Sequence, residues 1–264
     1  MFSIKKLYLF FLTAFLFLTL SRTFTVLFLT EAKTGFLIGS SKLVAIILFV
    51  ICLFVLLVLA FAAFMCEKKP IFTAKPSFVT AVWCFAVAVA ILADIATGFN
   101  TSFLFFSCLR ALFGLLSAAT FVLYGLYYFN KAKFFGVFFA PVVLFFVFKT
   151  VEVFTNYSVL AVICDHVFEI IILCLFMLFF LGYAKIQSNI KIKSKRVWVV
   201  LGFVASCVAI SYQISNYICL LSGGGAALHG QNTVSWAITT LSVFILLTIN
   251  DMCEKGSVVV EEQK

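Results

Sequence analysis

Eight hydrophobic runs divide the chain, and most of them are long enough to cross a bilayer as a helix. A segment inside hydrocarbon must satisfy its own backbone hydrogen bonds, so runs of this length indicate α-helices. We therefore predict an all-α integral membrane protein: a polytopic bundle of about eight transmembrane helices that forms one transmembrane domain, 1–264. The runs cover residues 7–29, 43–65, 78–97, 103–128, 134–148, 157–184, 197–221 and 233–250.

The composition agrees with a membrane location and excludes several other classes of protein. Hydrophobic residues make up 65% of the 264 residues and charged residues only 11%, which is far from the composition of a soluble domain. The net charge of +9 comes from basic residues between the hydrophobic runs, so it indicates topology and does not predict nucleic-acid binding. Nine cysteines are scattered without a Cys-x-x-Cys pair, which argues against a disulfide framework or a zinc ribbon.

The basic residues also predict the orientation of the helices. Lysines and arginines follow every even-numbered run, most densely in the segment Lys185 to Arg196, whereas the opposite side has only Lys33, Lys42 and Lys149. Basic loops stay cytoplasmic, so we expect both ends of the chain in the cytoplasm. The fifth run, 134–148, is short and has Pro141 in its middle, but without it the basic segment would lie outside.

One short repetition raises the question of an internal duplication. Met65 to Lys68 after the second run recurs as Met252 to Lys255 after the eighth. Two parallel halves of four helices, 1–133 and 134–264, would explain the repetition, as in some transporters. Chance similarity beside a membrane explains a tetrapeptide equally well.

The sixth run, 157–184, contains the most informative polar group, formed by Asp165, His166 and Glu169. Asp165 and Glu169 are four residues apart, so their carboxyl groups share one helix face. Ionisable groups inside a membrane are costly and are commonly functional. Glu169 lies deepest, roughly 18 Å from the outer end of its run, and is the candidate for holding a coupled proton.

Other polar residues lie at a similar depth in neighbouring runs. Counting about 1.5 Å per helical residue, each lies roughly 6 to 12 Å from the outer end of its run. We expect an outward-facing polar layer, to which the candidates for ligand binding or ion coupling are Arg22, Asp94, Arg110, Asp165, His166, Glu169, Gln213 and Asn216. Small residues share three of these helix faces, which indicates contact with protein. They are Ala86, Ala90 and Thr97 with Asp94; Ser107, Gly114, Ser117 and Ala118 with Arg110; and Gly202, Ser206 and Ala209 with Gln213 and Asn216.

Charge balance within this layer leaves a functional and a structural interpretation open. Two arginines face three carboxylates, which leaves about one negative charge for a proton or a cation to balance. Alternatively, Arg22 and Arg110 pair with Asp94 and Asp165 only to fix the helix register. In either case we expect Arg110 to form an ion pair with Asp94 or Asp165.

Three functions fit the sequence, and the first is our main hypothesis. A small polar solute or a proton is bound or transported at the polar layer of a bacterial plasma-membrane protein. Alternatively, the chain is a non-catalytic sensor or assembly subunit that contacts a partner protein through the cytoplasmic loop Lys185 to Arg196. The third function is an intramembrane enzyme that uses Asp165, His166 and Glu169. No cofactor, metal site or catalytic residue is assigned: a single intramembrane histidine does not make a haem site, and the metal set Asp165, His166, Glu169 and His229 is weak.

Overall fold

The protein is described here from a computed structural model, which describes residues 4–31, 37–65, 76–98, 104–130, 135–157, 163–188, 190, 195–222 and 235–261. Eight α-helices run through these residues: α1 (Ile4–Phe24), α2 (Lys42–Phe64), α3 (Phe78–Thr97), α4 (Leu104–Asn130), α5 (Ala140–Tyr157), α6 (Ile163–Gln187), α7 (Lys195–Leu221) and α8 (Trp236–Glu261). A π-helical turn, η1 (Thr25–Leu29), continues α1, and the 3-10 turns η2 (Gly39–Ser41) and η4 (Gly136–Phe139) precede α2 and α5.

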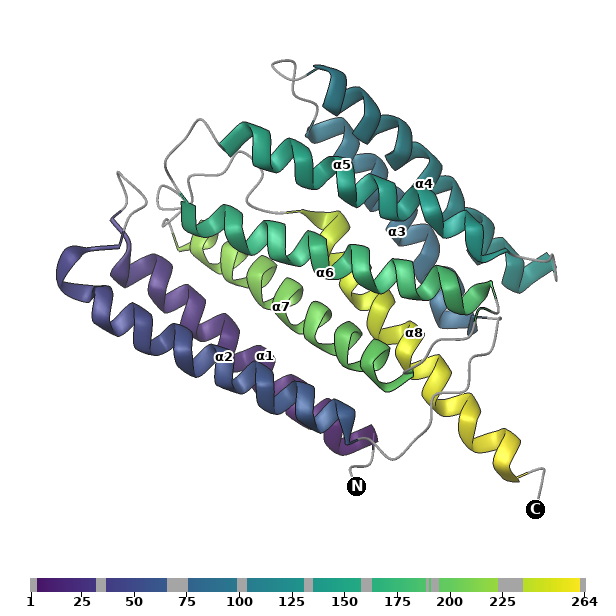
Figure 1. Cartoon of the computed structure of the whole chain (residues 1–264), viewed down its shortest axis with the longest axis horizontal. Helices are drawn as coiled ribbons and strands as arrows, with labels where there is room; N and C mark the ends of the chain where they lie inside the picture. The colour runs from purple at the N-terminus through teal and green to yellow at the C-terminus, as the bar shows by residue number, and fades with distance from the viewer. Residues whose placement is uncertain are drawn as a thin grey trace.

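The helices form a ring with one additional pair outside it. Each helix from α3 to α8 packs against the next one, and α8 packs back against α3. Helices α1 and α2 pack against each other and against α7, and Figure 1 shows them at the edge of the bundle opposite α3, α4 and α5. The start of α1 and the end of α8 lie at the same end of the bundle (Figure 1).

The fold confirms an all-α polytopic membrane protein. Among the described residues, seven helices are long and apolar enough to cross a membrane, and the apolar part of α8, Trp236–Met252, is somewhat shorter. Much of the surface is made of exposed large apolar side chains, as expected for helices in contact with lipid. The number of crossings, the cytoplasmic location of both ends and the division into halves 1–133 and 134–264 stay predictions.

The fifth helix differs from the run that the sequence predicted. Residues Gly136–Thr155 form a continuous helical segment of 20 residues, long enough to cross, and Pro141 lies in the first turn of α5 instead of its middle. Proline is tolerated there because the first turn does not need its missing N–H donor. Lys149 and Glu152, expected in an outer loop, therefore lie inside the helix. The next helix correspondingly begins at Ile163 instead of residue 157.

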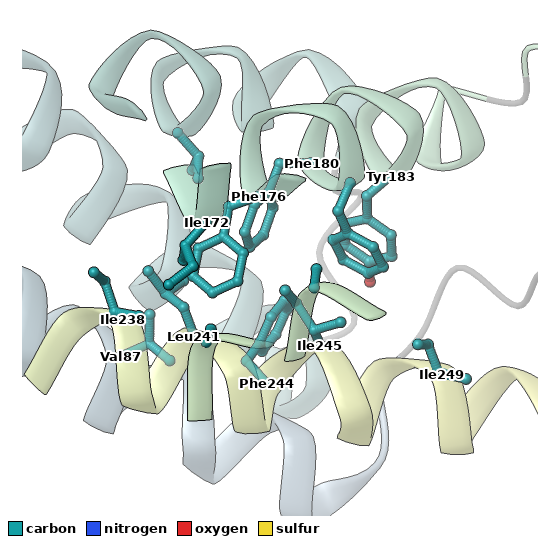
Figure 2. Packing of buried hydrophobic residues seen from close by; sticks show 14 of the residues in the cluster. Val87, Ile172, Phe176, Phe180, Tyr183, Ile238, Leu241, Phe244, Ile245 and Ile249 are labelled. Carbon is teal, nitrogen blue, oxygen red and sulfur yellow. The ribbon is translucent and has the colours of Figure 1, made fainter. Parts of the chain in front are cut away.

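Aromatic side chains fill the centre of the ring. Figure 2 shows Phe176 and Phe180 of α6 opposite Leu241 and Phe244 of α8. The rings of Phe180 and Phe244 are stacked with centroids 6.1 Å apart, and Phe121 of α4 meets Phe244 edge-on at 5.1 Å. All of these side chains are buried. This apolar layer lies between the polar residues at the two ends of the bundle.

Gly136 allows η4 to approach the end of α6 closely. A Cβ atom at this position would lie 2.2 Å from the carbonyl oxygen of Ala184 and 2.6 Å from the amide nitrogen of Ser188. These are backbone atoms, so they cannot move aside by a change of rotamer. The entry of the chain into α5 therefore depends on a glycine here.

We predict that Gly136→Ala lowers the free energy of unfolding by about 1 to 3 kcal/mol, because overpacking displaces one backbone segment from another. Gly39→Ala is the matched control, since a Cβ at Gly39 meets no atom within 4 Å. Thermal unfolding in the same detergent measures both variants. Equal melting temperatures for the two would contradict the close contact at Gly136.

Candidate functional site

Two charged residues connect the C-terminal half of α5 to the neighbouring helices. Lys149 and Glu152 lie three residues apart, on one face of the helix, and both are buried. Lys149 binds a carboxylate of α3, and Glu152 binds a guanidinium of α4. Charges are retained inside a membrane protein when they are paired in this way. We refer to Asp94, Arg110, Lys149, Glu152 and Glu169 as the charged layer.

Asp94 accepts hydrogen bonds from two side chains, one on α5 and one at the start of α8. Lys149 Nζ donates to both of its carboxylate oxygens at 2.8 Å, and the hydroxyl group of Ser235 donates to Oδ1 at 2.8 Å. Ser235 precedes α8, and its backbone N–H donates to Gln213 Oε1 at 2.9 Å. Its hydroxyl oxygen also accepts from the amide of Ile238, so it caps the start of α8. These bonds connect α3, α5, α7 and α8.

The second ion pair joins α4 to α5. Arg110 Nη1 lies 2.9 Å from Glu152 Oε2, and each side chain has 4% of its surface exposed. Ser107 donates to the other carboxylate oxygen of Glu152 at 2.8 Å. Arg110 Nη2 donates to the carbonyl oxygen of Gly98, so its positive charge lies at the C-terminal end of α3, where the helix dipole favours a cation.

The expected partner of Arg110 is thus corrected. We predicted that Arg110 pairs with Asp94 or Asp165, and the first alternative is wrong, because Asp94 binds Lys149 and Arg110 binds Glu152. Arg110 still lies within electrostatic range of Asp94. Asp165, the other expected partner, has its backbone in α6, but its side chain and that of His166 lie outside the residues that the structure describes. Their proposed roles stay predictions.

Glu169 is the remaining carboxyl group of the charged layer. It begins the inward-facing stripe of α6 that continues with Ile172, Leu173 and Phe176, all of which are buried. Glu169 itself is partly exposed, and it lies within electrostatic range of Lys149, Asp94, Arg110 and Glu152. Among the described residues, no hydrogen bond or ion pair reaches its carboxyl group.

Arg22 and Asn216 form a second polar contact beside the charged layer. Arg22 Nη2 donates to Asn216 Oδ1 at 3.2 Å, and the guanidinium lies over the ring of Tyr212 at 4.1 Å and over that of Phe168 at 5.4 Å. Cation–π contacts of this kind stabilise a guanidinium away from water. Gln213 and Asn216 both lie on α7 but contact different polar groups. Gln213 accepts a hydrogen bond from Ser235, which binds Asp94 of the charged layer, and Asn216 accepts one from Arg22.

The predicted helix faces are correct for α4 and α7 but only in part for α3. Ser107, Gly114, Ser117 and Ala118 are buried with Arg110, and Gly202, Ser206 and Ala209 are buried with Gln213 and Asn216. On α3, however, Ala86 and Thr97 are exposed. The buried face there includes the predicted Ala90 together with Val87, Ala88 and Ile91, and Asp94 follows Ile91 about one turn later.

Comparison with known proteins assigns no function to these residues. No protein-family model, curated protein or solved structure matches the chain. The chemistry of the site must therefore be argued from its geometry.

A polar cluster at the other end of the ring was missed by the sequence analysis. The hydroxyl groups of Tyr124 and Tyr183 lie 2.5 Å apart, and Gln187 Nε2 donates to Tyr183 at 3.1 Å. Nearby, Asp251 accepts from the amide of Ser77 and from the Thr80 hydroxyl, which ties α8 to the start of α3. Tyrosines near membrane interfaces are common, so their sequence positions alone gave no sign that two of them meet.

The arrangement leaves one carboxyl group of the charged layer in excess. Lys149 and Arg110 each neutralise one carboxylate, whereas no cation among the described residues forms an ion pair with Glu169. The carboxylate oxygens of Asp94 and Glu152 already accept hydrogen bonds or take part in an ion pair. Few carboxylate oxygens are therefore available to coordinate a metal cation beside Glu169. A proton needs only one oxygen, and it would make the layer neutral.

We predict that Glu152→Leu partly rescues the stability lost in Arg110→Met. Removing one partner of a buried ion pair costs about 3 to 5 kcal/mol, because the other charge is left without compensation, whereas replacing both partners by apolar side chains is far milder. Asp94→Leu combined with Arg110→Met is the comparison and should show a smaller rescue, because these two side chains lie within electrostatic range but form no ion pair with each other. Unfolding in detergent is measured for all singles and doubles. Additive losses for Arg110 with Glu152 would contradict the pairing.

Proposed function

We propose that the protein binds a small polar solute and a proton in the charged layer and transports the solute across the membrane. Four ionisable side chains from three helices form two buried ion pairs, and Glu169 of a fourth helix lies within electrostatic range of them. Placing these charges inside the bundle has a large energetic cost that lipid contact alone does not require. Substrate and ion sites of membrane transporters are commonly built from such groups at the interface between helices.

The observation that carries this proposal is the carboxyl group of Glu169, which has no partner among the described residues. In our proposal Glu169 holds the coupled proton. When the proton leaves, the layer gains a negative charge within electrostatic range of Lys149 and Arg110. Either cation would then be shared between Glu169 and its present partner, which changes the contacts between α6, α5 and α4. Protonation is thereby linked to helix packing.

The polar solute would be a charged or zwitterionic molecule, because both signs of charge are present at this depth. Arg22 with Asn216 offers a cationic group on the α1 side of α7, and the carboxylates lie on the ring side. Transport would also require the phenylalanine layer beneath to open, since Phe180 and Phe244 are stacked across the centre of the ring.

We also propose a bacterial plasma-membrane location with both ends in the cytoplasm. The support is the distribution of lysines and arginines, which are denser after even-numbered helices. With Lys149 placed inside α5, the side opposite the basic loops has one basic residue fewer. The charge asymmetry is therefore stronger than the sequence alone indicated.

A non-transporting sensor or assembly subunit is the second candidate. It is favoured by the completeness of the two ion pairs and by the continuous aromatic layer, both of which would suit a static scaffold. For a scaffold, Glu169 has no role in proton movement. A single substitution at Glu169 separates the two functions.

We predict that Glu169→Gln abolishes proton-coupled transport while the fold is kept, because the amide mimics a protonated carboxyl group. Purified protein in liposomes, with a pH-sensitive dye inside and a pH gradient imposed, is tested for proton flux with a panel of amino acids as solutes. Thermal unfolding is measured on the same samples.

Glu152→Gln is the control for loss of an ion pair, and it should lower stability by about 3 to 5 kcal/mol. A large loss of stability in Glu169→Gln, or proton flux equal to that of the wild type, would contradict the proposed role. Absence of solute-dependent proton flux in the wild type would favour the scaffold.

A further inference from the structure

A lateral groove between α2 and α7 lies outside the charged layer and faces the membrane. Its volume is about 600 Å³, within the range of roughly 300 to 1,000 Å³ typical of sites that hold small molecules. Apolar side chains line it, including Phe54, Leu57, Val58 and Phe61 of α2 and Val197 and Val200 of α7. A groove of this composition inside a bilayer suits a hydrocarbon chain.

The length and position of the groove match one leaflet of the membrane. It runs along α2 from Phe54, near the middle of that helix, to Phe64 at its end. At about 1.5 Å per residue this span is roughly 15 Å, which is half of the ~30 Å hydrocarbon core. The groove therefore extends from the membrane centre to one surface, as the acyl chain of a single lipid does.

A cation lies where the headgroup of such a lipid would be. Arg196, in the first turn of α7, has its guanidinium 5.9 Å from the ring centroid of Phe64, the residue that ends the groove. The side chain is partly exposed, and no carboxylate or hydrogen-bond acceptor contacts it in the described part of the chain. Arginine binds phosphate through two parallel hydrogen bonds, and basic pockets between transmembrane helices hold anionic headgroups.

We propose that the groove between α2 and α7 binds one anionic phospholipid, with one of its two acyl chains along α2 and its phosphate on Arg196. This site does not depend on the proposed transport function. The charge of Arg196 selects an anionic headgroup over a zwitterionic one. The apolar groove requires the acyl chain, so free phosphate alone should not occupy it.

The test is lipid binding by native mass spectrometry of the full chain, released from detergent and titrated with phosphatidylglycerol or with phosphatidylcholine of the same acyl chains. We expect one phosphatidylglycerol to be retained in preference to phosphatidylcholine. Arg196→Gln should weaken this binding about fivefold, the factor that one basic residue at the membrane surface contributes. Lys185→Gln, which removes an exposed lysine at the end of α6, is the matched control and should keep the wild-type affinity.

A second pair of variants tests the groove without changing any charge. Val197→Phe fills the groove and should reduce binding of the lipid, whereas Val79→Phe enlarges an equally exposed valine on α3 and should not. Equal weakening by Arg196→Gln and Lys185→Gln would show diffuse attraction to the membrane surface and would overturn the site. Unchanged binding in Val197→Phe, binding of inorganic phosphate alone, or a dimer that Val197→Phe dissociates would also overturn it.

Discussion

The burial of Lys149 and Glu152 in α5 is the constraint on which the packing of α3, α4 and α5 depends. Their partners, Asp94 on α3 and Arg110 on α4, lie on two different helices, so α5 cannot shift without separating an ion pair. Inside a membrane, an unpaired charge has a much larger cost than in water, and the pairs therefore determine how α3, α4 and α5 face one another. Ser235 extends the same constraint to α8 through Asp94.

The two ends of the ring are held by different kinds of contact. At the end that contains the charged layer, ion pairs and hydrogen bonds connect the helices. Stacked phenylalanines fill the centre, and the hydroxyl groups of Tyr124 and Tyr183 meet at the other end. Apolar packing tolerates sliding and rotation better than a bidentate ion pair does, because it has no strict direction. A change of charge at Glu169 would thus act on the end of the bundle where helix contacts are most specific.

The fold was largely predictable from the sequence, but the partners within the site were not. Long apolar runs give the helices directly, and the small residues near Arg110 and Gln213 correctly indicated their buried faces. The end of α5 was not predictable in this way, because charged residues such as Lys149 and Glu152 at the end of an apolar run are typical of a loop. Only the structure shows that each has a partner of opposite charge on a neighbouring helix. Asp94 and Arg110 lie on neighbouring helices and have opposite charges, so pairing them was reasonable while Lys149 was placed outside the membrane. The position of a residue within its hydrophobic run predicts its depth in the membrane, and so which groups share a layer. Which of those groups form a pair depends on the rotation of each helix and on its contacts.

In our proposal, Glu169 gives the charged layer a function beyond packing, and its protonation is directly measurable. Infrared difference spectroscopy of the purified protein at neutral pH, comparing the wild type with Glu169→Gln, reports the carbonyl stretch of a protonated carboxylic acid, which an ionised carboxylate lacks. We predict that the wild type shows this band and that Glu169→Gln loses it. A wild-type spectrum without the band, or a band that persists in Glu169→Gln, would contradict the proposal that a proton on Glu169 neutralises the charged layer.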